Sequence, residues 1–263
     1  MIPISDKIKR KLVTLLFPVL LLLFWQFFFS GGYLSPHLLP SPESVIRQVV
    51  KLFVEEGFVN HILTSLKRVL TGFLIGSLSG FLFGLLMGLS RTAEKMFAPT
   101  FHVIRQVPII GWIPLIVMWC GMTELPRIII IAVAAFYPIT LNTFAGVRSV
   151  SKEYIELASV YGYKKLAFIR KIVLPAAFPS ILTGLSLSVG MSWAMLMAAE
   201  IFIETYDGIG TRIQAGREKF NIPLVITGIA TVGLLGLLMT LAVEKLANVL
   251  DRGRAVRKEG INN

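Results

Sequence analysis

Long apolar runs, separated by short charged or proline-containing segments, are the strongest constraint on how this chain can fold. Hydrophobic residues make up 55% of the 263 residues and the mean hydropathy is +0.74, which is too apolar for a soluble domain. Inside a bilayer the backbone must satisfy its own hydrogen bonds, and a run of about 20 apolar residues does so by crossing as a helix. The sequence therefore predicts an all-α, polytopic membrane protein that forms a single domain over residues 1–263.

Six of these runs are predicted to span the membrane. The spans lie at approximately residues 12–29, 69–89, 98–122, 128–147, 176–199 and 222–243. A cleaved signal peptide is the alternative for the first run, although the run is long for one and no small-residue cleavage pattern follows Phe29. Pro108, Gly111 and Pro114 interrupt the third run, which is therefore expected to be a broken helix.

Two further helical patterns concern packing. The second run has a glycine at every fourth residue, at Gly72, Gly76, Gly80, Gly84 and Gly88. Such a stripe allows the backbone of another helix to approach closely.

Between the first and second runs, Pro42 begins an amphipathic helix that Gly57 can end. That helix lies either on the membrane surface or against the bundle of spans.

The distribution of basic residues predicts how the spans are oriented. The formal net charge is +11, but the Lys and Arg residues alternate with apolar spans instead of forming one nucleic-acid-binding face. Six spans place both termini on one side, which carries 17 Lys and Arg residues against 6 on the other. The positive-inside rule then makes both termini and the loop 148–175 cytoplasmic, in a multi-pass protein of the cell (inner) membrane.

Recognisable catalytic and metal-binding patterns are absent from the sequence. Cys120 is the only cysteine, and His37, His61 and His102 have no ligand spacing, so neither a disulfide nor a metal site is predicted. No Gly-Lys dipeptide occurs, which excludes the usual phosphate-binding loop, and no nucleophile motif is present. The chain is therefore expected to be neither an enzyme nor the carrier of a cofactor of its own.

One polar, basic segment, residues 153–175, interrupts the apolar sequence and reads EYIELASVYGYKKLAFIRKIVLP. Its first part has a helical pattern that Gly162 can end, because glycine tolerates the left-handed conformation. A second amphipathic run leads to Leu174-Pro175. Two short helices around a glycine, flanked by spans, are expected to project from the bilayer as a contact surface for a partner.

The spacing in this segment resembles the signature loop of ABC importer permeases, the binding-protein-dependent transport inner-membrane components. The residues that match are Glu156, Ala158, Gly162, Ile172, Leu174 and Pro175, while Leu157 replaces an alanine of the pattern. In that family the loop contains the coupling helix that docks on the ATP-binding subunit. The resemblance implies the type I permease fold with six transmembrane helices. It assigns coupling to the ATPase subunit to Glu156, Leu157, Ala158, Gly162, Leu174 and Pro175.

Most of the chain resembles one branch of these permeases, which serves nitrate, taurine and aliphatic sulfonates. The stretches that carry this likeness are Leu39-Pro40-Ser41-Pro42, Ser65-Leu66-Lys67-Arg68 with Gly72-Phe73, Pro108 with Pro114-Leu115, Trp119-Cys120-Gly121, Phe136-Tyr137-Pro138, Leu174-Pro175 with Pro179, Trp193 with Ala199-Glu200, and Gly208-Ile209-Gly210. The branch implies import of a sulfonate-, nitrate- or taurine-like anion by alternating access. A vitamin precursor or another small organic molecule is the alternative cargo, and an autonomous channel or an intramembrane enzyme is the competing class of protein.

The resemblance also implies a set of partners. They are a second copy of this chain, two ATP-binding cassette subunits that bind the ATP and magnesium, an extracytoplasmic solute-binding protein, and membrane lipid. A nucleic acid is not among them.

Polar residues near membrane depth are the candidates for the substrate pathway. They are Gln106, Asn142, Ser188, Ser192, Trp193 and Glu200. Hydrogen bonding between helices is the alternative for Asn142 and the serines, and a clamp with a basic group is the alternative for Glu200. Arg105 either lines the pathway with the segment that follows it or extends to the cytoplasmic interface.

Overall fold

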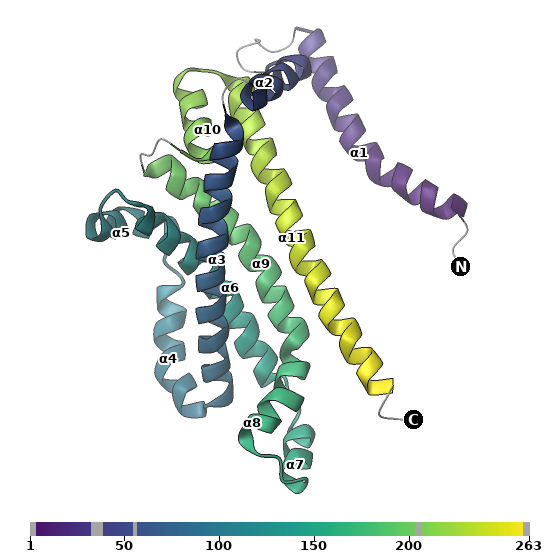
Figure 1. The fold of residues 1–263 in the computed structure, drawn as a ribbon, viewed down its shortest axis with the longest axis vertical. Helices are drawn as coiled ribbons and strands as arrows, with labels where there is room; N and C mark the ends of the chain where they lie inside the picture. The colour runs from purple at the N-terminus through teal and green to yellow at the C-terminus, as the bar shows by residue number, and fades with distance from the viewer. Residues whose placement is uncertain (1–3, 33–38, 55–56, 204–206, 260–263) are drawn as a thin grey trace. The chain divides into compact units, whose positions relative to one another are not determined.

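The structure is a computed structural model that describes residues 4–32, 39–54, 57–203 and 207–259, and every regular element in these ranges is a helix. In chain order the elements are α1 (Ile4–Ser30), α2 (Pro42–Val54), α3 (Phe58–Leu89), α4 (Arg91–Ile104), η1 (Ile109–Trp112), α5 (Ile113–Cys120), α6 (Glu124–Arg148), α7 (Lys152–Val160), α8 (Lys165–Phe168), η2 (Ile169–Val173), α9 (Leu174–Phe202), α10 (Ile209–Glu218) and α11 (Ile222–Glu259). They are drawn in Figure 1. The predicted all-α class is confirmed.

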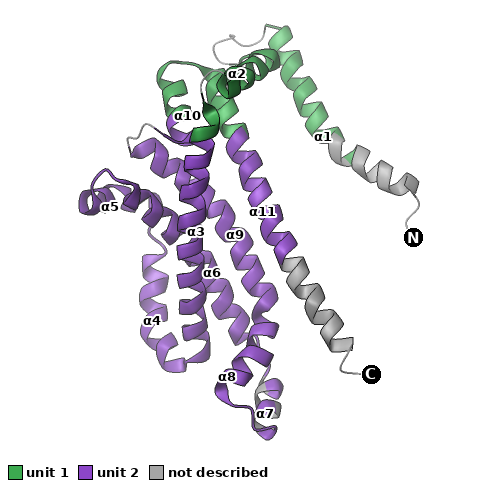
Figure 2. Cartoon of the chain, in the orientation of Figure 1, with its two compact units in different colours: residues 1–60, 212–230 green, residues 61–211, 231–263 purple. Residues whose placement is uncertain are grey.

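The chain divides into two compact units, which Figure 2 colours separately. One unit contains residues 1–60 and 212–230, and the other contains residues 61–211 and 231–263. Within the first unit, Trp25 Nε1 donates a hydrogen bond of 2.9 Å to the carbonyl oxygen of Pro40. Within the second unit, α3, α6 and α9 pack together, and five of the six predicted pathway residues lie on α6 and α9.

Four helices among the described residues are long and apolar enough to cross a membrane. They are α3, α6, the stretch from α8 through η2 to α9, and α11 as far as Leu246. These helices contain the predicted second, fourth, fifth and sixth spans. The first predicted span, 12–29, lies within α1, where Leu16–Ser30 forms a shorter apolar helix.

The third predicted span, 98–122, is divided between two helices. α4 begins at Arg91, and the Oγ of Ser90 accepts a hydrogen bond of 3.2 Å from the N–H of Ala93 as its N-cap. The helix ends at Ile104, and η1 with α5 continues at an angle of 85° to it. Pro108 has no N–H with which to continue the helical hydrogen bonds, so the break falls just before it. The expected break is confirmed, and its angle is far larger than a kink in one continuous helix.

The glycine stripe of α3 forms the contact between α3 and α6. A Cβ atom on Gly76 would lie 2.1 Å from the carbonyl oxygen of Ala132, and one on Gly80 would lie 2.1 Å from Cγ2 of Ile139. The hydroxyl of Thr140 donates a hydrogen bond of 3.2 Å to the carbonyl oxygen of Gly80. The two backbones therefore approach to distances that only glycine permits, which confirms the packing interpretation of the stripe.

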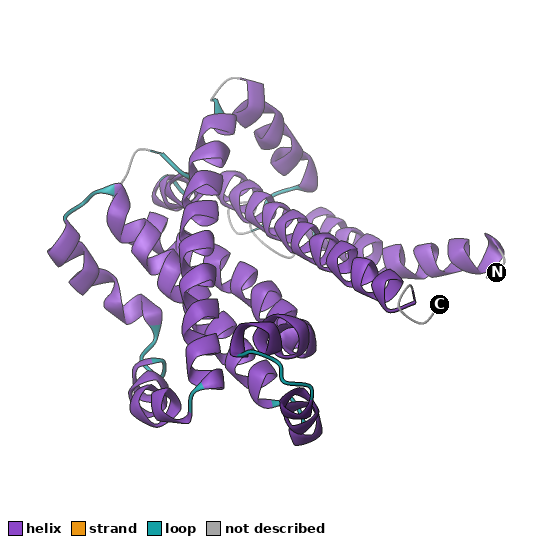
Figure 3. Cartoon of the chain, turned by 60° about the horizontal axis from the view of Figure 1, so that its bottom comes forward, coloured by secondary structure: helices purple, strands orange, loops and turns teal. Residues whose placement is uncertain are grey.

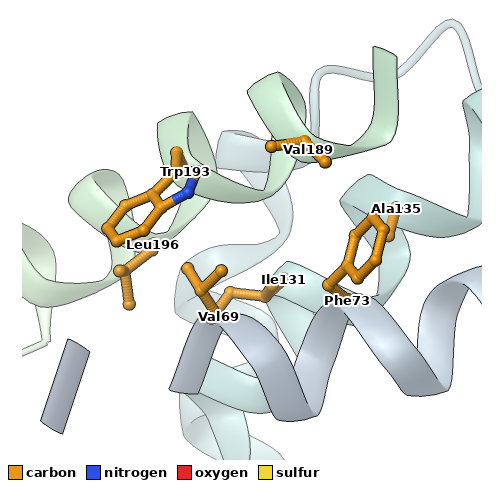
Figure 4. Close-up of a cluster of buried hydrophobic side chains, with 7 residues drawn as sticks. All are labelled: Val69, Phe73, Ile131, Ala135, Val189, Trp193 and Leu196. Atoms are coloured by element: carbon orange, nitrogen blue, oxygen red, sulfur yellow. The ribbon is translucent and has the colours of Figure 1, made fainter. Parts of the chain in front are cut away.

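α9 closes the other side of α6 and completes a buried apolar cluster. A Cβ atom on Gly184 would lie 2.8 Å from Cβ of Asn142, so small residues again allow close approach. Figure 4 shows the cluster, in which side chains from α3, α6 and α9 meet. Its members are Val69, Phe73, Ile131, Ala135, Val189, Trp193 and Leu196. This three-helix contact is what holds the site residues of α6 and α9 in place.

We expect Gly76→Ala to destabilise the protein, because the added methyl group meets backbone atoms of α6 that cannot rotate away. Overpacking of this kind typically costs about 1–3 kcal/mol. The measurement is the thermal unfolding midpoint of the purified protein in detergent. Gly190→Ala is the matched control, because a Cβ atom at Gly190 has no heavy atom within 4 Å. Equal midpoints for the two variants would contradict the close α3–α6 contact.

Candidate functional site

The loop between α6 and α9 folds as two short helices around Gly162, as its sequence predicts. Gly162 has a φ of +65°, and the N–H of Tyr163 donates a hydrogen bond of 3.0 Å to the carbonyl oxygen of Ala158. A left-handed residue after the helix end with this bond is the Schellman C-cap. No other atom lies within 4 Å of a Cβ built at Gly162, so the position requires glycine for its backbone angle and not for space.

The cap explains the spacing between Ala158 and Gly162. The Schellman bond joins the carbonyl oxygen of Ala158, the third-last residue of the helix, to the N–H of Tyr163, the residue after Gly162. The bond fixes the number of residues between these two groups at four, and Gly162 is the last of them. Ala158 is buried, Glu156 is exposed, and the side chain of Leu157 lies outside the described residues. The four coupling positions in this part of the loop therefore lie on the second half of α7 and its C-cap.

The second half of the loop leads into α9 through the π-helical turn η2. Leu174 begins α9, and Pro175 occupies its first turn, where a missing N–H is tolerated. Val173 is buried against Val147 and Ala177, so the exit of the loop is packed on α6 and α9. Figure 1 shows α7 and α8 beyond the ends of α6 and α9, and the view in Figure 3 brings this end of the structure forward.

Exposed apolar and aromatic side chains cover this loop. The ones with large exposed fractions are Tyr154, Val160, Tyr161, Tyr163 and Leu166. Basic side chains lie among them at Lys164, Lys165, Arg170 and Lys171, all exposed. A patch of exposed apolar residues rimmed by charge is typical of a protein–protein contact.

A second feature is an open pocket of about 570 Å³ at the break between α4 and η1. It is lined by Arg105, Val107, Pro108, Ile109, Ile110, Tyr137, Pro138, Leu141, Asn142, Leu187, Met191 and Met195. Asn142 is the one of the six predicted pathway residues that lines it, and its Nδ2 donates a hydrogen bond of 2.9 Å to the carbonyl oxygen of Pro138. Gln106 is exposed in the turn beside Arg105 but is not part of the lining.

The remaining predicted pathway residues of α9 lie inside the helix packing. Ser188 is fully buried, and its hydroxyl lies 2.9 Å from the carbonyl oxygen of Ala135 on α6 and 2.7 Å from that of Gly184. Ser192 and Trp193 are also buried, and their Oγ and Nε1 atoms have no hydrogen-bond partner among the described residues. The structure therefore does not bring these three side chains together with Asn142 in the pocket.

Glu200 is the centre of a buried polar network at the other end of α9. Its side chain is inaccessible to solvent, and Oε1 accepts hydrogen bonds from Ser65 Oγ at 2.7 Å and from Arg68 Nη1 at 2.8 Å. Oε2 accepts a hydrogen bond of 2.8 Å from the N–H of Gly210. Arg68 also donates two hydrogen bonds to Glu124, at 2.7 and 2.6 Å, and one to the carbonyl oxygen of Asp207.

The network ties the third turn of α3 and the first turns of α6 and α10 to the end of α9. A Cβ atom on Gly208 would lie 2.5 Å from Cδ of Glu200, and Gly208 has a φ of +136°, so glycine is required twice over. The N–H of Ile209 donates a hydrogen bond of 2.9 Å to Ser65 Oγ. The groups that bond to the buried carboxylate thus form one connected set, which is the arrangement of a structural clamp.

Sequence reasoning singled out Glu200 but missed Ser65, Arg68 and Glu124. Ser65 and Arg68 fall at the edge of an apolar run, where a basic residue is expected to be exposed. A signal was nevertheless present, because the stretches 65–68, 199–200 and 208–210 all carry the likeness to one branch of permeases. The structure shows that these three stretches meet around one carboxylate.

Comparison with known proteins gives one family and several relatives. Residues 59–256 match the family described as binding-protein-dependent transport system inner membrane component. The chain is 33% identical to the aliphatic sulfonates transport permease protein SsuC of Bacillus subtilis, over 91% of this chain and 87% of the relative. It is 31% identical to the taurine transport system permease protein TauC of Escherichia coli, over 93% and 89%. It is also 31% identical to the bicarbonate transport system permease protein CmpB of Synechococcus elongatus, over 89% and 88%.

Solved structures show the same fold at low sequence identity. A bacterial ABC transporter involved in the import of the acidic polysaccharide alginate superposes with a TM-score of 0.62 at 18% identity, covering 93% of this chain and 98% of that one. The MetNI methionine ABC transporter in its inward-facing conformation gives 0.60 at 16% identity, covering 74% and 99%.

The clamp predicts a large effect of removing one charge. Arg68→Gln removes the ion-pair partner of the buried Glu200 carboxylate, which we expect to lower the free energy of unfolding by about 3–5 kcal/mol. The double variant Arg68→Gln with Glu200→Gln is expected to recover part of this loss, because the side chain that lost its partner is then neutral. Thermal unfolding in detergent measures both. Arg47→Gln is the control, since its ion pair with Glu43 is exposed and its removal is expected to change nothing measurable.

Proposed function

The chain belongs to the family of binding-protein-dependent transport system inner membrane components, and on that premise we propose that it forms the membrane pathway of an importer for a small anionic solute. It is a multi-pass permease subunit of an ABC transporter and not an enzyme, and ATP is hydrolysed by a separate subunit. A solute-binding protein is the second partner that the family implies.

Coupling to the ATP-binding subunit is assigned to the loop 148–175. The observation that carries this assignment is the Schellman cap at Gly162, which ends α7 beyond the ends of the long helices. The exposed apolar and basic side chains around it supply a surface for a protein partner. Glu156, Leu157 and Ala158 shape the docking helix, and Leu174 with Pro175 fixes the exit into α9.

Two copies of the chain are proposed to form the pathway, with both termini and the coupling loops in the cytoplasm of the cell. The excess of Lys and Arg residues on the side of the loop supports this orientation. Closure of two ATP-binding subunits would draw the two loops together and open the pathway outward, and hydrolysis would reset it. ATP and magnesium are proposed to bind to those subunits, while this chain supplies the moving helices.

The proposed cargo is a small organic or inorganic anion. The relatives are described as permeases for aliphatic sulfonates, taurine and bicarbonate, each of which carries an anionic group. Arg105 in the pocket provides a positive charge for such a group. A vitamin precursor is the alternative cargo, and comparison of uptake of these solutes by the assembled transporter discriminates between them.

We expect Gly162→Pro to abolish ATP-driven uptake while the protein remains inserted in the membrane. Proline fixes φ near −65°, whereas the cap requires +65°, so the coupling helix would lose its end. Gly162→Asn is the matched control and is expected to retain most of the uptake, because asparagine tolerates the left-handed conformation and the position has free space. Uptake of labelled taurine, ethanesulfonate and bicarbonate measures the transport activity, and immunodetection in the membrane fraction measures how much of each variant is inserted. Uptake at the wild-type rate by the proline variant would contradict the coupling assignment.

Reconstitution separates the importer from an autonomous channel. Proteoliposomes that contain the chain, the ATP-binding subunit and the solute-binding protein are expected to accumulate the solute only with ATP. Flux through the chain alone, without an ATP-binding subunit, would favour the channel.

A further inference from the structure

Arg105 occupies a position where a charged side chain needs a partner. It follows α4, whose 14 residues rise by about 21 Å from Arg91, a large part of the roughly 30 Å of a bilayer core. The other walls of the pocket are the middle turns of α6 and α9. The Arg105 guanidinium makes no hydrogen bond or ion pair with any other residue that the structure describes. A charge at this depth is costly unless it faces water or a ligand.

The rest of the pocket has two kinds of surface. The polar residues besides Arg105 are Tyr137 and Asn142, and the Asn142 amide keeps one N–H after its bond to Pro138. The apolar wall consists of Val107, Ile109, Ile110, Leu141, Leu187, Met191 and Met195. A volume of about 570 Å³ lies in the usual range for small-molecule sites. One cation and two neutral donors beside an extensive apolar wall match a molecule with an anionic head and an apolar tail.

We propose that this pocket is a transmembrane subsite for an organic anion with an alkyl tail, such as an alkanesulfonate, in which Arg105 binds the anionic head and the wall of α6 and α9 binds the tail. The proposal rests on the proposed importer function and deepens it by naming the cargo class. Arginine suits a sulfonate or carboxylate because its planar fork donates two parallel hydrogen bonds. An inorganic oxyanion such as bicarbonate or nitrate would satisfy Arg105 but leave the apolar wall without a contact.

Chain length is the property that separates these cargos. Each methylene group buried against the apolar wall is expected to tighten binding by about fourfold until the pocket is filled. Affinity should therefore rise from ethanesulfonate to pentanesulfonate, and both should bind more tightly than nitrate. Pentanol, which has the tail without the charge, should bind more weakly than pentanesulfonate by tenfold or more, roughly the loss expected for a charge-assisted hydrogen bond.

The test is direct binding to the full chain, purified and reconstituted in lipid nanodiscs, with empty nanodiscs to correct for partition into lipid. Calorimetric titration with ethanesulfonate, pentanesulfonate, pentanol and nitrate measures the affinities. Arg105→Gln is expected to weaken pentanesulfonate binding by about tenfold or more, and Arg105→Lys to recover part of it. Arg91→Gln is the matched control, because Arg91 begins the same helix but does not line the pocket, and it is expected to bind as the wild type does.

Two results would overturn the proposal: wild-type affinity that does not depend on chain length, or equal affinities of Arg105→Gln and Arg91→Gln for pentanesulfonate. The first result needs no variant, so a folding defect in Arg105→Gln cannot obscure it.

Uptake by the complete transporter separates this subsite from the importer function. If the transporter takes up solute with ATP but Arg105→Gln binds pentanesulfonate as the wild type does, the subsite proposal is wrong and the importer function stands. If binding depends on Arg105 but ATP drives no uptake, the importer function is wrong and the binding site stands.

Discussion

Contact between the backbones of α3 and α6 is the constraint on which the rest of the helix packing depends. Lipid offers apolar side chains no gain from association, so helices in a bilayer associate through close packing and interhelical hydrogen bonds. The glycines of α3 supply that packing, with the Gly80 carbonyl oxygen also accepting a hydrogen bond from Thr140. α6 in turn packs on α9, and this places Asn142 and Met191 in the walls of one pocket.

The two ends of this packed core serve different purposes. At one end, Arg68 and Glu200 hold α3, α6 and α9 to the loop that precedes α10, with no ionised group left unpaired in the network. At the other end, α7 and α8 extend past the core and are covered by exposed apolar side chains. A clamp at one end and a projecting loop at the other suit a transporter in which a partner acts on the loop and the clamped helices move together.

How much the sequence reveals depends on the range of the interactions involved. The Gly162 cap and the break before Pro108 arise from neighbouring residues, so local pattern alone predicts both. The contact of Arg68 with Glu200 joins positions 132 residues apart, and apolar periodicity indicates which residues avoid water but not which helices meet. Ser188 shows the same limit, because its burial against Ala135 depends on how α9 packs on α6. The angle of 85° at the α4–η1 break is likewise a property of packing.

The central claim is that this chain is driven through the loop around Gly162. Photo-crosslinking from a benzoylphenylalanine at position 160 tests it most directly, because Val160 is 84% exposed beside the cap. Met122, which is 71% exposed at the opposite end of α6, is the reference position. In the purified complex, Val160→benzoylphenylalanine is predicted to crosslink to the ATP-binding subunit, and Met122→benzoylphenylalanine is not. A crosslink to that subunit from position 122 instead of position 160 would contradict the account.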